Sequence, residues 1–283
     1  MTNSPSIHQL SAQFQKDGFA ILPNKIPAET LAQVKAEIDR FVDEYQPDEH
    51  ASVFRTDTRD KDRDEAFLTS ANGVHGFLEA DAFDDHGVLQ VPKNRCLNKI
   101  GHAMHDLLPH FGELARSSII KQAFTIGGHE STHIVQSMVI FKQPKIGGVV
   151  RWHQDASYLL TQPSSVLGIW IALEEATKEN GCLWMAPGMH HSPLRELYTV
   201  NWATRQGYLA DIDPTPWPSA ADEIPLEVEA GSVVVFHDHM PHRSAANLST
   251  KSRVAITFHG YNPNTTWLSK NWLHREGMKD FVV

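Results

Sequence analysis

The apolar positions in the first part of the chain recur at the intervals of amphipathic helices. Residues 6–17 and 27–45 place apolar side chains three and four positions apart, which predicts two helices. The apolar run 19–22 lies between them and predicts a short strand. Residues 98–111 also have helical spacing, so we expect a third helix with Lys99 near its start. The first part of the chain is therefore expected to be mainly helical.

From residue 133 onward the period of the apolar positions changes to two, which is typical of β-strands. Turn-forming glycine, proline and asparagine residues separate the runs. The predicted strands are residues 133–142, 149–158, 166–173, 182–185, 226–229, 232–237 and 253–261. Helices followed by many short strands favour a mainly β protein, an antiparallel double sheet or barrel with the N-terminal helices packed outside. No repeat and no linker divides residues 1–283, so we expect a single domain.

Two segments lack this periodicity. Residues 55–65 are almost all charged, with mixed signs, which predicts a solvated loop. A mobile lid near a functional site is the sharper alternative. Residues 191–225 form a long irregular insertion, and such insertions in compact domains are often functional loops or covers. We expect substrate recognition in this insertion.

Composition and charge narrow the range of partners. Of the 283 residues, 41% are hydrophobic and 21% are charged, as in ordinary globular proteins. The formal net charge of −9 argues against nucleic acid or an anionic membrane as the main partner. No apolar run is long enough to span a membrane, and no secretory signal is visible. Two cysteines, Cys96 and Cys182, lie far apart without metal-type spacing, so the expected compartment is the cytoplasm.

The candidate chemistry begins with His153 and Asp155. In an extended strand these two side chains point to the same side, so they can converge on one metal ion. With 17 histidines in the chain, a single His-x-Asp pair is by itself a weak signal. The case for a metal site is stronger because the pair lies inside a predicted double sheet. An imidazole and a carboxylate still leave the metal short of at least one ligand.

The third ligand is expected in the segment that follows the strand 232–237. Three histidines there compete for the role, namely His237, His239 and His242. His242 gains weight because Arg253 begins the next strand. A turn over residues 246–252 would place the two strands antiparallel, with Arg253 beside the metal pocket.

Two histidines and one carboxylate on one face of a metal leave three positions open, as in the facial triad of non-haem Fe(II) oxygenases. Many such enzymes use 2-oxoglutarate, which chelates the metal through its 1-carboxylate and keto oxygen. Its distal carboxylate then needs a cation some distance from the iron. Arg253 suits this role because a guanidinium binds a carboxylate through two parallel hydrogen bonds and stays charged when buried.

The residues named so far belong to a larger set of motifs. The set comprises Asp17-Gly18-Phe19, NKIGHA at 98–103, IFKQP at 140–144, HQDAS at 153–157, NGCLW at 180–184, Pro187-Gly188-Met189-His190, His242-Arg243-Ser244 and Arg253. With these motifs the sequence resembles the phytanoyl-CoA dioxygenase family of iron- and 2-oxoglutarate-dependent oxygenases over most of its length. It departs from the family at Met189, where serine is usual, and Arg151-Trp152 before the His-x-Asp pair also differs.

The resemblance implies a double-stranded β-helix, or jelly roll, of the cupin-like kind. It implies Fe(II) held by His153, Asp155 and His242. It further implies that 2-oxoglutarate is bound by Arg253 and Ser244, in a pocket also lined by Lys99, Met138 and Trp170. From the residues alone, Lys99 would be a helix-surface lysine, and Met138 and Trp170 would be core side chains.

The expected activity is hydroxylation of a C–H bond in a small organic substrate, with consumption of dioxygen and release of succinate and CO2. A free metabolite is preferred over an acyl-CoA because the sequence has no concentrated basic patch for the CoA phosphates. Two alternatives stay open. A cupin-like metal enzyme without 2-oxoglutarate would have no use for Arg253 or Ser244, and a non-catalytic module would sense 2-oxoglutarate or iron.

Overall fold

The computed structural model describes residues 5–46, 52–54 and 65–283. Apart from Glu65, the charged segment 55–65 lies outside the described residues. Among the residues described, no helix is both long and apolar enough to cross a bilayer.

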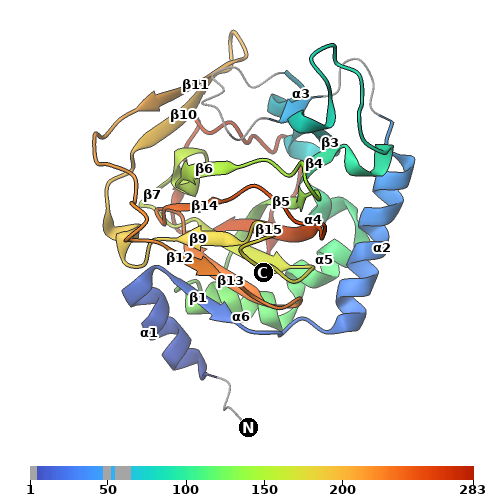
Figure 1. The fold of residues 1–283 in the computed structure, drawn as a ribbon. Coiled ribbons are helices and arrows are strands. Elements are labelled where there is room, and N and C mark those ends of the chain that lie inside the picture. Colours follow the sequence, from blue (N-terminus) through green and yellow to red (C-terminus); the bar gives the residue numbers. More distant parts are fainter. Residues whose placement is uncertain (1–4, 47–51, 55–64) are drawn as a thin grey trace.

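Two mainly antiparallel sheets form the centre of the protein (Figure 1). Within the described residues, the larger sheet has nine strands in the order β1 (Phe19–Leu22), β13 (Val233–His237), β8 (Leu167–Ala172), β15 (Arg253–Tyr261), β5 (His133–Lys142), β4 (Leu97–His102), β3 (Val74–Glu79) and β2 (Val53–Phe54), with β17 (Phe281–Val282) beside β5. The smaller sheet has the order β12 (Ile224–Leu226), β9 (Leu183–Met185), β14 (His242–Ser244) and β6 (Val150–His153). A short pair joins β7 (Thr161–Gln162) to β16 (Thr266–Trp267). The predicted double sheet is confirmed, and the strands predicted at 133–142 and 253–261 have the predicted bounds.

The helices lie mostly on the outer face of the larger sheet, as predicted (Figure 1). They are α1 (Ile7–Asp17), α2 (Ala28–Glu44), α3 (Glu65–Leu68), α4 (Met104–Leu107), α5 (Pro109–Arg116) and α6 (Ser118–Ile126). The first begins with a reciprocal capping box between Ser6 and Gln9, which satisfies amide groups that the helix leaves free. It ends at Gly18, whose φ of 81° is the left-handed conformation that glycine adopts without strain.

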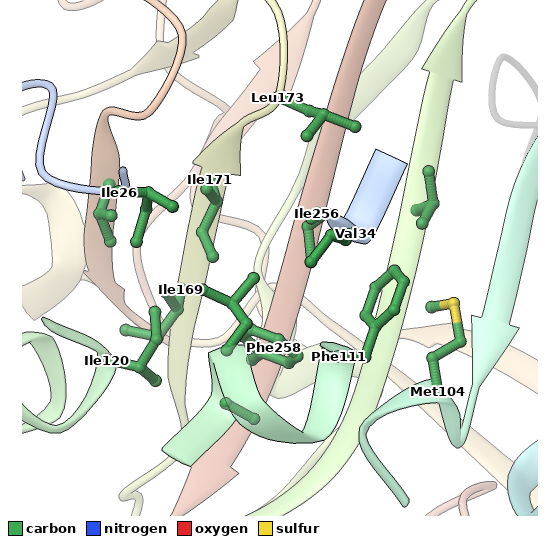
Figure 2. Close-up of a cluster of buried hydrophobic side chains, with 14 of the residues drawn as sticks. Ile26, Val34, Met104, Phe111, Ile120, Ile169, Ile171, Leu173, Ile256 and Phe258 are labelled. Atoms are coloured by element: carbon green, nitrogen blue, oxygen red, sulfur yellow. The ribbon is translucent and has the colours of Figure 1, made fainter. Parts of the chain in front are cut away.

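Alternation along the central strands divides the interior into two layers. Ile169 and Ile171 of β8 and Phe258 of β15 point outward and pack against the helices, as Figure 2 shows. Their neighbours Trp170 and Ala255 point the other way, toward the smaller sheet. Because β8 and β15 are buried on both faces, they are apolar or uncharged along most of their length.

One predicted helix is wrong. Residues 98–111 do not form a single helix, because Lys99 lies in β4 between β3 and β5, and the chain turns helical only from Met104. All six residues of β4 are buried. A strand covered on both faces shows no alternation of polar and apolar residues, so β4 has no strand pattern in the sequence. The residues after it do have helical spacing, and the predicted helix therefore included β4 by mistake.

The insertion 191–225 is more regular than its sequence suggests. It contains a hairpin of β10 (Glu196–Asn201) and β11 (Gln206–Asp211), which projects at the upper left of Figure 1. Tyr198, Val200 and Leu209 pack beneath it in a cluster with Phe67 and Trp272. Burial alternates along both strands, but Glu196 is buried and Tyr208 is exposed, so the order of apolar and polar residues does not predict the hairpin.

Arg195 anchors this insertion. Its side chain is only 2% exposed, and it donates hydrogen bonds to the carbonyls of Thr215 and Pro216, each at 3.1 Å, and to the Ser192 hydroxyl at 3.0 Å. Arg195→Met should lower the free energy of unfolding by about 2–4 kcal/mol because these acceptors lose a charged donor. Thermal unfolding should show a Tm lower by about 5–10 °C.

The exposed Arg205, at the tip of the same hairpin, provides the control. It forms an ion pair with the exposed Glu65, and surface pairs contribute about 0–1 kcal/mol. Arg205→Met should therefore leave the Tm nearly unchanged. Equal effects of the two substitutions would mean that Arg195 does not anchor the insertion.

Candidate metal centre and active-site cavity

His153, Asp155 and His242 converge at one end of the smaller sheet. His242 begins β14 and lies directly opposite His153, the last residue of β6. The Asp155 Oδ1 atom lies 3.8 Å from Nε2 of His153 and 3.7 Å from Nε2 of His242. One candidate ligand atom from each side chain lies within 4.8 Å of the other two. This donor set of two imidazoles and one carboxylate fits a divalent transition metal.

The His-x-Asp pair reaches this geometry in a different way from the one predicted. The strand ends at His153, and Asp155 opens a short 3-10 helix (Asp155–Ser157) rather than continuing β6. Between them, the fully buried Gln154 donates from its amide to the carbonyls of Pro193 and His239. The fixed turn, and not strand alternation, brings the carboxylate beside the two imidazoles.

The other two histidines considered as third ligands lie elsewhere. His237 ends β13 in the larger sheet, and its Nδ1 atom is 2.8 Å from Asp238. His239 packs edge-on against His237, at 5.7 Å between ring centres. Among the described residues, only His242 joins His153 and Asp155 in a cluster of possible metal ligands.

Backbone carbonyls orient both imidazoles. Nδ1 of His153 lies 3.0 Å from the Arg151 carbonyl, and Nδ1 of His242 lies 2.9 Å from the Met240 carbonyl. A carbonyl oxygen only accepts, so each Nδ1 must carry the proton and each Nε2 presents its lone pair to the cluster. Burial lowers the pKa of His153 to about 3, with a further contribution from the facing His242. His153 is therefore a neutral imidazole at neutral pH, as a metal ligand must be.

A fourth residue, His259, supports the carboxylate. Its Nε2 lies 3.0 Å from Oδ2 of Asp155, which leaves Oδ1 directed at the two histidines. Burial alone would raise the pKa of Asp155, but the imidazoles of His259 and His242 outweigh it and lower the pKa below its usual range. The sequence reasoning missed His259. The sequence could have indicated it, because His259 lies an even number of residues after Arg253 in the same predicted strand. Residues an even number apart in a strand point to the same face.

His259→Leu should weaken metal binding by about 10- to 100-fold, because outer partners of metal ligands typically contribute that much. His259→Gln should retain part of the affinity, since its amide can still donate to Asp155. Titration with Fe(II) under anaerobic conditions, followed by calorimetry, measures both. Identical affinities in the Leu variant and the unchanged protein would exclude this supporting role.

A cavity of about 200 Å³ opens beside the cluster, between the two sheets. The residues that the resemblance assigned to 2-oxoglutarate all line it, namely Lys99, Met138, Trp170, Ser244 and Arg253. Lys99 does not lie on a helix surface; its ammonium group is buried over the rings of Phe67 and Phe77, 4.8 and 4.5 Å from their centres.

Arg253 is the most deeply buried cation of this cavity, with 1% of its surface exposed. Its Nε donates to the Gly181 carbonyl at 3.2 Å, while Nη1 is buried without any hydrogen-bond partner. Burial lowers its pKa to about 10, so it remains charged at neutral pH. A buried guanidinium with an unused donor is costly unless an anion binds there, so the site fits a carboxylate ligand.

The predicted pairing of the strands that carry His242 and Arg253 is wrong. Strand β14 belongs to the smaller sheet and β15 to the larger one, so the two residues face each other across the cavity. The connecting loop crosses from one sheet to the other and is tied by Asn247, whose amide donates to the Lys142 carbonyl at 2.8 Å. The pocket therefore lies between the two sheets, and not beside a hairpin of the two strands as predicted.

The cavity mouth carries two more arginines, and the insertion neutralises both. Arg151 makes a two-pronged ion pair with Glu196 of β10, at 2.9 and 3.1 Å. Arg243 binds both carboxylate oxygens of Glu223 and lies over the ring of Trp184. The residues before the His-x-Asp pair therefore form part of the mouth.

The sequence matches the model of one known protein family over most of its length. The model of the phytanoyl-CoA dioxygenase (PhyH) family matches residues 14–255. The chain belongs to this family. The family resemblance seen in the sequence is thereby confirmed.

Relatives and solved structures agree with this membership. The phytanoyl-CoA dioxygenase domain-containing protein 1 homolog of Caenorhabditis elegans is 38% identical, over 93% of this chain and 94% of its own. Phytanoyl-CoA dioxygenase 1 of Oryza sativa subsp. japonica is 35% identical, over 93% of this chain and 92% of its own. The non-haem α-ketoglutarate-dependent epimerase SnoN is similar in structure, with a TM-score of 0.65 at 15% identity over 93% of this chain and 86% of its own. EctD from S. alaskensis has a TM-score of 0.63 at 17% identity over 95% and 82%. The structural likeness confirms the jelly-roll fold.

Proposed function

We propose that this protein is an Fe(II)- and 2-oxoglutarate-dependent dioxygenase that hydroxylates a C–H bond of a small organic substrate. Residues 1–283 would act as one catalytic domain, with the site between its two sheets. The observation that carries the proposal is the unpaired Nη1 of Arg253, buried in the cavity that also contains the His153–Asp155–His242 cluster. A metal-binding cluster alone suits many enzymes, whereas an unneutralised buried guanidinium beside it calls for an anionic cosubstrate.

Each group of residues in the cavity would bind a different ligand. Neutral His153 and His242 and ionised Asp155 would hold Fe(II) and leave the remaining positions open. Arg253 and the Ser244 hydroxyl would bind the distal carboxylate of 2-oxoglutarate. When bound, iron and 2-oxoglutarate supply the oxidising power for C–H hydroxylation with dioxygen, releasing succinate and CO2.

The remaining cavity residues would orient ligands and exclude water. Trp170 lies with its ring 5.7 Å from the Arg253 guanidinium carbon, and Met138 of β5, on the other side of Thr257, also lines the cavity. Lys99 adds a positive charge from β4. An apolar wall of this kind strengthens the electrostatic contacts of a bound carboxylate by lowering the local dielectric.

A free small molecule fits the mouth better than an acyl-CoA, although the rice relative is named a phytanoyl-CoA dioxygenase. Arg151 and Arg243 are already neutralised by Glu196 and Glu223, so neither is available for the phosphates of CoA. We therefore propose a free metabolite as substrate, with dioxygen and 2-oxoglutarate as the other reactants.

Succinate release from 2-oxoglutarate tests the function. Purified protein with Fe(II), 2-oxoglutarate and dioxygen is incubated with matched pairs of free acids and their CoA thioesters, and succinate and oxygenated product are quantified by mass spectrometry. The proposal expects succinate and a product one oxygen atom heavier, obtained from the free acids. Turnover without 2-oxoglutarate would instead indicate a cupin-like metal enzyme. Iron and 2-oxoglutarate binding without any succinate would indicate a sensing module.

A further inference from the structure

A second buried cation lies beside Arg253 in the cavity wall. Lys142 ends β5 and is the residue directly opposite Arg253 in the β5–β15 register. Directly opposed residues of antiparallel strands point to the same face, with their Cβ atoms about 4.5–5.5 Å apart. Both side chains line the cavity, and Lys142 is only 2% exposed. Nothing in the family resemblance assigns a role to Lys142.

The surroundings of Lys142 provide no carboxylate in direct contact with its ammonium group among the described residues. Its aliphatic stem runs along Gly181, the residue whose carbonyl accepts from Arg253, and its ammonium group donates to the Gly148 carbonyl. Glu79, the acid whose charge acts on Lys142, is held by Asn98 at 2.8 Å and by the Gly148 amide at 3.5 Å. In the described part of the chain, no ion pair within 4.0 Å joins a carboxylate to Lys142 or Arg253. Two adjacent buried cations without a paired anion destabilise the protein until an anion binds.

We propose that Lys142 and Arg253 together bind the distal carboxylate of the 2-oxo acid cosubstrate, and that Lys142 is the residue that selects a dicarboxylic over a monocarboxylic 2-oxo acid. The inference rests on the proposed function, since it concerns the same site. One guanidinium can bind a carboxylate by itself. The second cation contributes the additional charge that a cosubstrate without the distal carboxylate cannot use.

The titration of Lys142 supports this arrangement. Burial, followed by the charge of Arg253, lowers its pKa to about 7, while Glu79 acts in the opposite direction. Arg253 and Glu79 are the charged groups that affect it most from the neighbouring elements. A carboxylate entering between the two cations raises the pKa again, so at pH 8 binding should take up close to one proton.

The test compares two ligands that differ only at the distal end. Mn(II)-loaded protein is titrated calorimetrically, without oxygen, with 2-oxoglutarate and with 2-oxopentanoate, which has a methyl group in place of the distal carboxylate. Lys142→Met should weaken binding of 2-oxoglutarate by about 10- to 100-fold and leave that of 2-oxopentanoate unchanged. Lys145→Met, at an exposed lysine three residues further on, should change neither.

Proton uptake gives a second readout that a structural role would not produce. Titrations at pH 8 in two buffers of different ionisation enthalpy should show uptake of about one proton in the unchanged protein and almost none in Lys142→Met. Thermal unfolding of the metal-loaded variant without cosubstrate should give a Tm equal to or above that of the unchanged protein, since burying the Lys142 amine is unfavourable whether it stays charged or loses its proton.

Three results would overturn the inference. Equal losses of affinity for both ligands in Lys142→Met would mean that Lys142 only supports the Gly148 loop. Unchanged binding of 2-oxoglutarate would mean that Lys142 does not contact the cosubstrate. If the unchanged protein bound neither ligand, the proposed function itself would fail, independently of Lys142.

Discussion

Asp155→Ala should abolish iron binding and turnover. Asp155 supplies the one negative charge among the three candidate ligands, and its removal leaves two neutral imidazoles that hold a metal weakly. The loss of Fe(II) affinity should exceed the roughly 100-fold that removal of an outer partner costs. Anaerobic calorimetry with Fe(II) measures the affinity, and succinate release measures turnover.

His239→Ala is the matched control for this experiment. His239 competed with His242 in the sequence, yet it packs against His237 and lies outside the cluster. The variant should bind Fe(II) as the unchanged protein does, while His242→Ala should behave as Asp155→Ala does. The reverse pattern would mean that the metal is bound elsewhere.

Arg253→Met should weaken 2-oxoglutarate binding by about 100-fold or more. Removing one partner of a buried charged contact costs about 2–5 kcal/mol, because the other charge then loses its compensation. The same change should leave Fe(II) affinity intact, since the hydrogen bond that Arg253 makes goes to the Gly181 carbonyl and not to a member of the cluster. The measurement is the 2-oxoglutarate concentration required for half-maximal succinate release, with calorimetry of the metal-loaded protein beside it.

The stability of the variant distinguishes a binding role from a packing role. Without ligand, Arg253 is a buried cation with an unsatisfied Nη1, so Met in its place should leave the Tm unchanged or raise it. Unimpaired 2-oxoglutarate binding in Arg253→Met would favour the cupin-like alternative, in which this arginine has no part.

The candidate cluster of metal ligands was predictable from sequence where its chemistry depends on residue type and short spacing. The sequence indicated His153, Asp155 and Arg253 because a His-x-Asp pair followed by an arginine at the start of a later strand is more specific than either feature alone. The choice among three nearby histidines depended on where one strand ends and the next begins. Element ends are set by tertiary contacts, here the Gln154 amide and the β6–β14 pairing, which no local pattern contains.

The fold was predictable in its class and less so in its pairing. Alternation gave the bounds of β5 and β15, whose ends are marked by turn residues. It could not show that β14 and β15 lie in opposite sheets, because register and partner are decided by long-range contacts. Lys99 was placed on a helix because β4 is buried on both faces, and His259 and Lys142 were missed because their roles arise only from cross-strand neighbours.

The most direct test of the account is an anaerobic titration of the Fe(II)-loaded protein with 2-oxoglutarate, monitored by the visible charge-transfer absorption of the chelated complex. We predict a saturable band in the unchanged protein, no band in His153→Ala, and a band in Arg253→Met that requires far more 2-oxoglutarate. Bound iron that develops no band in the unchanged protein at any concentration of 2-oxoglutarate would contradict the account and leave a metal site with a different cosubstrate.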